Sequence, residues 1–275
     1  MKQWMIKLVA LFAMVAVAVS FSGCGISSGV MEACLTNTAQ ASSMTYEVET
    51  VMGMSVMGQP VSVKLSGEGS YTCDPVRVAM VLSQDTSGME METYTELIGD
   101  QYIQYLKIGE QWVKQALPSA SMTQDPKLAM EIYLEGISRY QKEGEEMVAG
   151  KTASKYSAVI EGEALEKVIQ ASGALDQLEQ SGLDASQAGE LYSDLSDLYI
   201  TLWVDETAMQ PVKIEMNLTE MMQSIMDKLG QMDDSAVDMD ITAFSLALTI
   251  TDYNNVDEII IPEEALSASE LEAAV

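Results

Sequence analysis

The sequence contains no histidine, which narrows the chemistry that its other reactive side chains could perform. Without an imidazole, Ser-His-Asp catalysis, Cys-His catalysis and histidine-ligated zinc sites are excluded. Carboxylates are abundant, with 42 Asp and Glu residues, but any glycosidase pair chosen among them would be arbitrary because separation in space decides that chemistry. We therefore expect a protein that is not an enzyme. A carboxylate-based glycan hydrolase is the one enzymatic alternative.

Two local motifs could hold a metal ion or a phosphate group. Asp233, Asp234, Asp238 and Asp240 supply hard oxygen ligands, but the run lacks the glycine and terminal glutamate of an EF-hand loop. We prefer a solvated acidic turn over a calcium site and expect no metal or cofactor. Gly67-Glu68-Gly69 lies inside a strand pattern and does not open a helix, so we interpret these glycines as relief for a sharply curved strand rather than as a phosphate loop.

The cysteines divide into one near the N-terminus and a later pair. Cys24 follows a basic start, an uncharged run over residues 8–19 and the triplet Phe21-Ser22-Gly23, which is secretory signal architecture. A run of about a dozen residues spans about 18 Å as a helix, which is short of the roughly 30 Å hydrocarbon core of a membrane. Cys34 and Cys73 could form a disulfide in an oxidising compartment, and two buried free thiols are the alternative.

The unusual feature of the composition is its 21 methionines. Methionine is flexible and polarisable, and it suits apolar surfaces that adapt to varied ligands. The candidate lining of a ligand cavity consists of Tyr46, Val63, Leu65, Met80, Met89 and Met91. Simple filling of the core is the alternative interpretation. The net charge of −28 repels phosphate backbones, so nucleic acid is not expected as a partner.

These side chains must be positioned by an antiparallel sheet with inserted helices. Alternating patterns and turn residues predict strands near 44–49, 61–71, 78–82, 89–93, 101–108, 111–115, 151–161, 199–205, 210–218, 237–252 and 259–261. Helical spacing predicts helices near 30–41, 125–140, 163–172, 174–180, 185–195 and 219–229.

Three local signals refine this α+β prediction. Asp125 followed by Pro126 is typical of a helix start. The apolar positions change from odd-numbered to even-numbered residues near Thr242 and Ala243, which predicts a bulge in this strand. We expect about ten strands in one domain over residues 30–266, between a tether at 24–29 and a frayed tail at 267–275.

Several phrases in the sequence resemble a known family. The triplet before Cys24 is similar to the bacterial lipobox, although the family prefers Leu at the position of Phe21. The other phrases are residues 105–112, 202–205 with 211–213, 252–256 and 261–265. Together they resemble the LolA-like lipoproteins, a group that includes mycobacterial LppX and LprG relatives and uncharacterised Gram-positive surface lipoproteins.

This resemblance implies a strongly curved antiparallel sheet, an unfinished barrel whose concave apolar side is covered by helices. It also implies a signal peptide over residues 1–23, cleavage before Cys24, and a diacylglyceryl lipid on that cysteine that carries acyl chains such as palmitate. An ordinary secretory signal cut near Ser22 is the alternative. The family has no catalytic residues to carry over.

The expected function is that of an extracytoplasmic protein held on the cell membrane by its lipid, whose sheet binds a lipid or another apolar ligand as a carrier or sensor. The alternative is an envelope protein that docks a protein partner and binds no small ligand.

Overall fold

A computed structural model of the chain describes residues 29–117, 125–172, 185–192, 195–232 and 239–271. The described helices are α2 (Gly29–Gln40), α3 (Pro126–Gly136), α4 (Gly162–Ala171), α6 (Ala185–Leu191), α7 (Thr219–Met232) and α8 (Glu263–Leu266). The strands β1 to β6 are Ser43–Val56, Gln59–Cys73, Val76–Gln84, Met89–Ile98, Gln101–Ile108 and Gln111–Leu117. The strands β7 to β12 are Arg139–Val148, Lys151–Ile160, Leu198–Asp205, Gln210–Asn217, Met239–Tyr253 and Ser269–Glu270.

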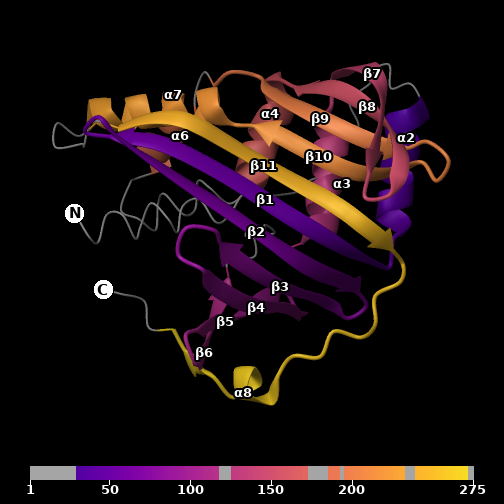
Figure 1. The fold of residues 1–275 in the computed structure, drawn as a ribbon, viewed down its shortest axis with the longest axis vertical. Coiled ribbons are helices and arrows are strands. Elements are labelled where there is room, and N and C mark those ends of the chain that lie inside the picture. Colours follow the sequence, from indigo (N-terminus) through magenta and orange to yellow (C-terminus); the bar gives the residue numbers. More distant parts are fainter. Residues whose placement is uncertain (1–28, 118–124, 173–184, 193–194, 233–238, 272–275) are drawn as a thin grey trace.

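All twelve strands belong to one open sheet in the order β12-β6-β5-β4-β3-β2-β1-β11-β10-β9-β8-β7. Neighbouring strands are antiparallel except for the short β12, which runs parallel to β6. Figure 1 shows the sheet as a twisted layer with α3 and α4 behind its upper strands and α8 beside β6. The prediction of a large antiparallel sheet with inserted helices is confirmed, with two strands more than expected.

The main hydrophobic core lies between one face of the sheet and the helices. Its buried side chains come from α2, α3, α4 and α7 and from the even-numbered positions of β1, β8 and β9 among other strands. Fully buried examples are Met44 of β1, Met130 of α3 and Leu202 of β9. We name this side of the sheet the inner face and the opposite side the outer face. Among the described helices, none is long and apolar enough to cross a membrane.

Two sequence signals are reproduced in detail. Asp125 caps α3, because its Oδ1 accepts a hydrogen bond from the backbone N–H of Leu128 at 3.0 Å. The bulge in β11 also lies where the parity changes, since Gly53 pairs with Ala243 while Met54 pairs with Ile241. Thr242 is therefore the extra residue, and it allows both halves of β11 to keep apolar side chains on the inner face.

Two elements differ from prediction. The helix expected over 125–140 ends at Gly136, and β7 follows as an edge strand that is almost wholly exposed. Such a strand carries no alternation because neither of its faces is buried. Residues 259–261 form no strand; Ile259 and Ile261 are buried while Ile260 is exposed, and this segment packs its side chains on the sheet.

The C-terminal segment covers part of the outer face. Ile261 and Ala265 pack on Tyr105, and the carbonyl of Ile259 accepts a hydrogen bond from Arg77 Nη1 at 2.9 Å. The stretch expected to fray instead contributes β12 at residues 269–270. The helix expected at 174–180, the signal peptide at 1–23 and the start of the tether lie outside the described residues.

Candidate ligand-binding face

The strand register places all six residues of the predicted cavity lining on the inner face. Tyr46 of β1 pairs with Gly69 of β2, which pairs with Met80 of β3. The next cross-strand rows of the same face hold Met91, then Leu65 and Met89, then Val63. Residues that pair across antiparallel strands point to the same side of a sheet, so the sequence identified one surface rather than scattered positions.

These six residues differ in how deeply they are buried. Tyr46 belongs to the main core, and Val63 and Met80 pack against it. Leu65 and Met91 are partly exposed, and Met89 is 65% exposed at the start of β4. The inner face therefore changes from packed core to partly uncovered sheet.

Three further side chains extend this partly uncovered area across the sheet. Leu82 pairs with Met91, Leu106 pairs with Thr93 of the adjacent row, and Val113 pairs with Leu106. Within the described residues, none of the three belongs to a hydrophobic cluster, and all are partly exposed. We name Leu65, Leu82, Met91, Leu106 and Val113 the apolar patch. The sequence analysis did not include Leu106 of β5 or Val113 of β6 in the candidate lining. The alternation of these two strands was used only to predict the strands themselves.

Two glycines allow close packing beside this patch. A Cβ atom on Gly69 would lie 2.3 Å from Tyr46 Cζ, so the aromatic ring rests directly on the backbone of β2. A Cβ atom on Gly67 would lie 2.7 Å from Leu82 Cδ2. The glycines expected to relieve a curved strand therefore make room for side chains of the inner face.

A buried carboxylate lies near one end of the same face. Asp125 is 6% exposed, and besides capping α3 it accepts a hydrogen bond from the Tyr71 hydroxyl to its Oδ2 at 3.3 Å. Burial raises the pKa of this carboxyl above its ordinary value, and the two hydrogen bonds oppose the rise.

This carboxylate also contributes to the raised pKa values of two other tyrosines. Burial, followed by the charge of Asp125, raises the pKa of Tyr102 to about 12 and also raises that of Tyr46. Tyr46 lies on β1 and Tyr102 on β5, so the charge of Asp125 acts on side chains from separate strands.

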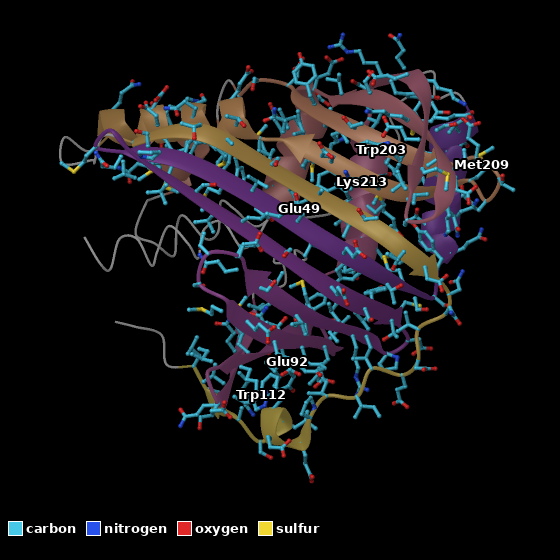
Figure 2. The ribbon with its side chains drawn as sticks, viewed as in Figure 1. Glu49, Glu92, Trp112, Trp203, Met209 and Lys213 are labelled. Carbon is cyan, nitrogen blue, oxygen red and sulfur yellow. The ribbon has the colours of Figure 1, made fainter. Side chains whose placement is uncertain are left out.

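The outer face is polar and has a shallow groove of about 630 Å³. Its lining includes Glu47, Glu49, Glu68 and Glu215, with Lys213 as its one cation. Lys213 Nζ lies 2.7 Å from a Glu215 carboxylate oxygen and 4.6 Å from the ring centre of Trp203. Figure 2 shows Glu49, Lys213 and Trp203 over the upper strands of this face, with Glu92 and Trp112 over the lower strands.

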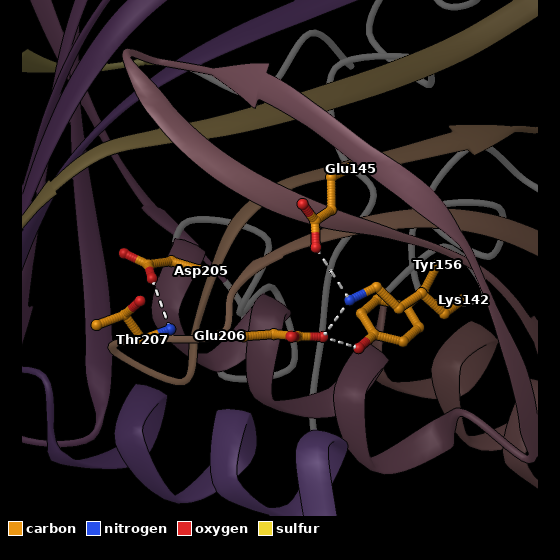
Figure 3. Close-up of polar contacts among 6 residues, drawn as sticks. All are labelled: Lys142, Glu145, Tyr156, Asp205, Glu206 and Thr207. Carbon is orange, nitrogen blue, oxygen red and sulfur yellow. Dashed lines mark hydrogen bonds and ion pairs between the residues drawn. The ribbon is translucent and has the colours of Figure 1, made fainter.

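A second polar cluster joins two hairpins near α2. Glu206 accepts hydrogen bonds from the Tyr156 hydroxyl and from Lys142 Nζ, the latter at 3.1 Å, and Lys142 also contacts Glu145 at 3.4 Å (Figure 3). These bonds lower the pKa of Glu206. The cluster connects the β7–β8 hairpin to the β9–β10 turn. We therefore interpret it as a set of contacts that stabilises the fold.

The cysteine pair does not form a disulfide in the structure. Cys34 is buried in α2, where burial raises its pKa to about 12, and Cys73 is a half-buried free thiol at the end of β2. Both thiols are thus free in the structure, but only Cys34 is buried, whereas the alternative to a disulfide was two buried thiols. Cys24 lies outside the described residues.

The acidic run considered for calcium is only partly within the described chain. Asp240 lies in β11, whereas Asp233, Asp234 and Asp238 lie outside the described residues. Across the part of the chain that is described, His, Cys, Asp and Glu side chains form no group of three or more that could hold a metal ion.

No protein-family model matches the chain, and no curated protein is significantly similar to it in sequence. Among solved structures, the lipoprotein LppX of Mycobacterium tuberculosis is 15% identical with a TM-score of 0.49, and the match covers 84% of this chain and 97% of LppX. LprF of Mycobacterium bovis is 11% identical with a TM-score of 0.46, covering 86% of this chain and 96% of LprF. A LolA superfamily protein of Nitrosomonas europaea is 8% identical with a TM-score of 0.31, covering 84% of this chain and 94% of that protein. These structural neighbours fall within the group that the sequence phrases resemble.

Proposed function

We propose that the chain is an extracytoplasmic lipoprotein that binds a lipid or another apolar ligand on the inner face of its sheet. The observation that supports this proposal is the apolar patch, five partly exposed aliphatic side chains on adjacent strands β2 to β6. Contiguous apolar surface, unlike apolar residues scattered singly, is a feature of ligand-binding and interaction sites. Leucine, valine and methionine side chains offer dispersion contacts to a flexible acyl chain and demand no particular polar group.

Anchoring through Cys24 is part of the same proposal. The small residues before Cys24 and the apolar run before them are the features that lipoprotein processing requires. A Cys24→Ser variant should fail to incorporate a palmitate analogue and should no longer fractionate with membranes. Continued incorporation of the label by the Cys24→Ser variant would refute lipidation at this position.

Ligand binding can be tested by native mass spectrometry and lipid extraction after expression in a lipid-containing host. We expect near-stoichiometric lipid on the native chain. Leu82→Glu should abolish it, since the substitution places a charge in the apolar patch, whereas Val81→Glu should not because Val81 is an exposed residue facing the outer side of the same strand. A lipid-free native protein, or equal lipid loss in both variants, would refute binding on the inner face.

A second function has support from the outer face. The groove lined by Glu47, Glu49 and Glu68 has the charge that suits a basic segment of an envelope protein partner. If the native chain carries no lipid, crosslinking in intact cells from the groove should capture such a partner. Capture that is unchanged when these three glutamates are replaced by glutamine would refute docking in the groove.

A further inference from the structure

The turn between β1 and β2 lies at the end of a hairpin that projects beyond the neighbouring strand. Among the described strands, β2 pairs with β3 only from Leu65 onward, so its residues 59–64 pair with β1 alone. Residues 57–62 are all exposed, with Met57 73% exposed and Val61 43% exposed. Figure 1 shows this end of β1 and β2 at the left margin of the sheet. We name residues 56–61 the hairpin tip.

The hairpin tip carries no charge in a chain whose net charge is −28. Residues 50–63 contain no charged side chain at all. The charges that border this stretch are Glu49 and Lys64, and they form an ion pair with each other at 2.7 Å. On the adjacent strand β11, Asp240 lies opposite Ser55, before the tip begins.

The other hairpin turns of the described chain carry or adjoin charged residues. The β7–β8 turn is followed directly by Lys151, and the remaining turns contain Asp74, Asp85, Asp100, Glu110 and Glu206. Removing an unpaired charge from water is costly, whereas apolar side chains gain free energy when they leave water. The hairpin tip is therefore the end of a hairpin that can be dehydrated most readily.

Methionine is unexpected at position 57 for two reasons. Met57 has a φ of 53° and Gly58 a φ of 75°, which are the positive values of a type I′ turn, and Asn-Gly is the preferred pair in such a turn. The 73% exposure of Met57 also leaves an apolar side chain in water. Neither the backbone conformation nor packing within the chain accounts for this residue. An exposed apolar side chain in a disfavoured conformation is the pattern expected where it contacts a partner.

The hairpin tip is joined to the apolar patch by a row of apolar side chains. Val61, Val63 and Leu65 alternate along β2 and therefore share the inner face. On the same face, Met54 of β1 pairs with Val61 and Met52 pairs with Val63. Leu65 belongs to the apolar patch and lies about 13 Å from Val61 at the usual rise of a strand. An acyl chain can thus pass from the tip to the patch along apolar surface.

Resting on the proposed function, we propose that the hairpin tip docks on the uncharged surface of a lipid bilayer and that the ligand passes between the bilayer and the apolar patch along the inner face of β2. The tip is far smaller than the roughly 20–30 residues that each partner contributes to a stable protein interface. A bilayer, in contrast, accepts a few apolar side chains and needs no matching polar contacts. Weak docking suffices for a chain that its proposed anchor at Cys24 holds beside lipid, because the effective concentration is high.

Flotation with vesicles of neutral phosphatidylcholine tests the docking. The protein is the chain from residue 24 onward with Cys24→Ser, which keeps every described residue and removes the anchor. Met57→Asn suits the type I′ turn better but makes the tip polar, so the vesicle partition coefficient should fall at least about fivefold while Tm is unchanged or rises. In the matched control Met147→Asn, which alters a methionine that is 67% exposed and adjacent to Glu146, the partition coefficient should not change.

Two further measurements locate the docked surface and follow the ligand. The indole of Val61→Trp should be quenched by phosphatidylcholine brominated on its acyl chains, whereas that of Met147→Trp should not; Trp112 and Trp203 are present in both variants and set the background. Loading of a fluorescent lipid from vesicles should be at least about fivefold slower for Met57→Asn than for the native sequence. The amount of lipid bound at equilibrium should be equal, because the apolar patch is intact.

The outcomes separate this inference from the proposed function. A protein that carries lipid but does not float with vesicles overturns docking and leaves ligand binding on the inner face in place. Equal partition of the native sequence, Met57→Asn and Met147→Asn also overturns docking at the tip. Equal loading rates for the native sequence and Met57→Asn overturn the passage of ligand along β2. A native chain that carries no lipid overturns the proposed function and the passage together.

Discussion

Replacing Gly69 with alanine tests how closely the Tyr46 ring lies on strand β2. An alanine Cβ would lie 2.3 Å from Tyr46 Cζ, well inside the contact distance of two carbon atoms, and Tyr46 is 4% exposed with little room to move. Overpacking of this kind costs about 1–3 kcal/mol, although alanine is otherwise favoured over glycine in a strand by about 0.5–1 kcal/mol. We expect a net loss of about 1–2 kcal/mol.

The matched control is Gly144→Ala in β7. No atom outside its own chain neighbours lies within 4 Å of a Cβ built there, and its backbone does not adopt a positive φ. For a chain of this size, 1 kcal/mol corresponds to about 2–4 °C in Tm, so Gly69→Ala should lower Tm by about 3–6 °C while Gly144→Ala leaves it unchanged or slightly raised.

A double-mutant cycle identifies the contact responsible. In a Tyr46→Leu background the shorter side chain should accommodate the new methyl group, so the cost of Gly69→Ala should fall to about 0.5 kcal/mol or less. Equal stability of Gly69→Ala and Gly144→Ala would refute the close approach of the ring. An unchanged cost in the Tyr46→Leu background would assign the strain to another contact.

Three further predictions follow from the titrating groups. Because burial raises the pKa of Asp125, the folded protein binds that proton more tightly than the unfolded chain, and this contribution to stability declines as pH rises above the ordinary value of 3.8. The free energy of unfolding of Asp125→Asn, measured with urea, should therefore rise relative to that of the native chain between about pH 4 and pH 7. A constant difference between the two proteins across this pH range would contradict the prediction. Cys34, fully buried and with its pKa raised to about 12, should react with a thiol reagent only after unfolding, whereas Cys73 should react in the native state; fast labelling of Cys34 would be inconsistent with its burial. Tyr156→Phe removes a donor to the Glu206 carboxylate and should cost about 1 kcal/mol, at the low end for a charged acceptor because that carboxylate is partly exposed to solvent; the same cost in a Glu206→Gln background would show that the hydrogen bond is not the cause.

The sequence was most informative where burial on one face forces alternation. The pattern of β2 and the change of parity at Thr242 both follow from apolar side chains kept toward the inner face, and both are found in the structure. β7 could not be predicted this way because an exposed edge strand has no buried face. Ile259 to Ile261 alternate as a strand does, but their partners are side chains of the outer face rather than a backbone ladder.

The candidate site was predictable in part for the same reason. Alternation identified six residues of one face, and the register confirms that they share it. The contact between Asp125 and Tyr71 was not predictable. Asp125 was recognised as a helix cap, but its hydrogen bond with Tyr71 joins positions 54 residues apart, and no local pattern encodes such a contact.

An open sheet of twelve strands leaves two edges, and each edge offers unpaired backbone groups to which another chain could add. At one edge, β12 occupies part of β6, and the backbone N–H of Leu271 donates to the carbonyl of Lys114 at 2.7 Å. At the other edge, β7 is rich in charged residues and carries a bulge at Glu143, where the register shifts between Lys142 and Gly144. Both edges thus resist growth by strand addition. A chain shortened before Ser269 would uncover β6 and should form oligomers at concentrations at which the full chain remains a monomer.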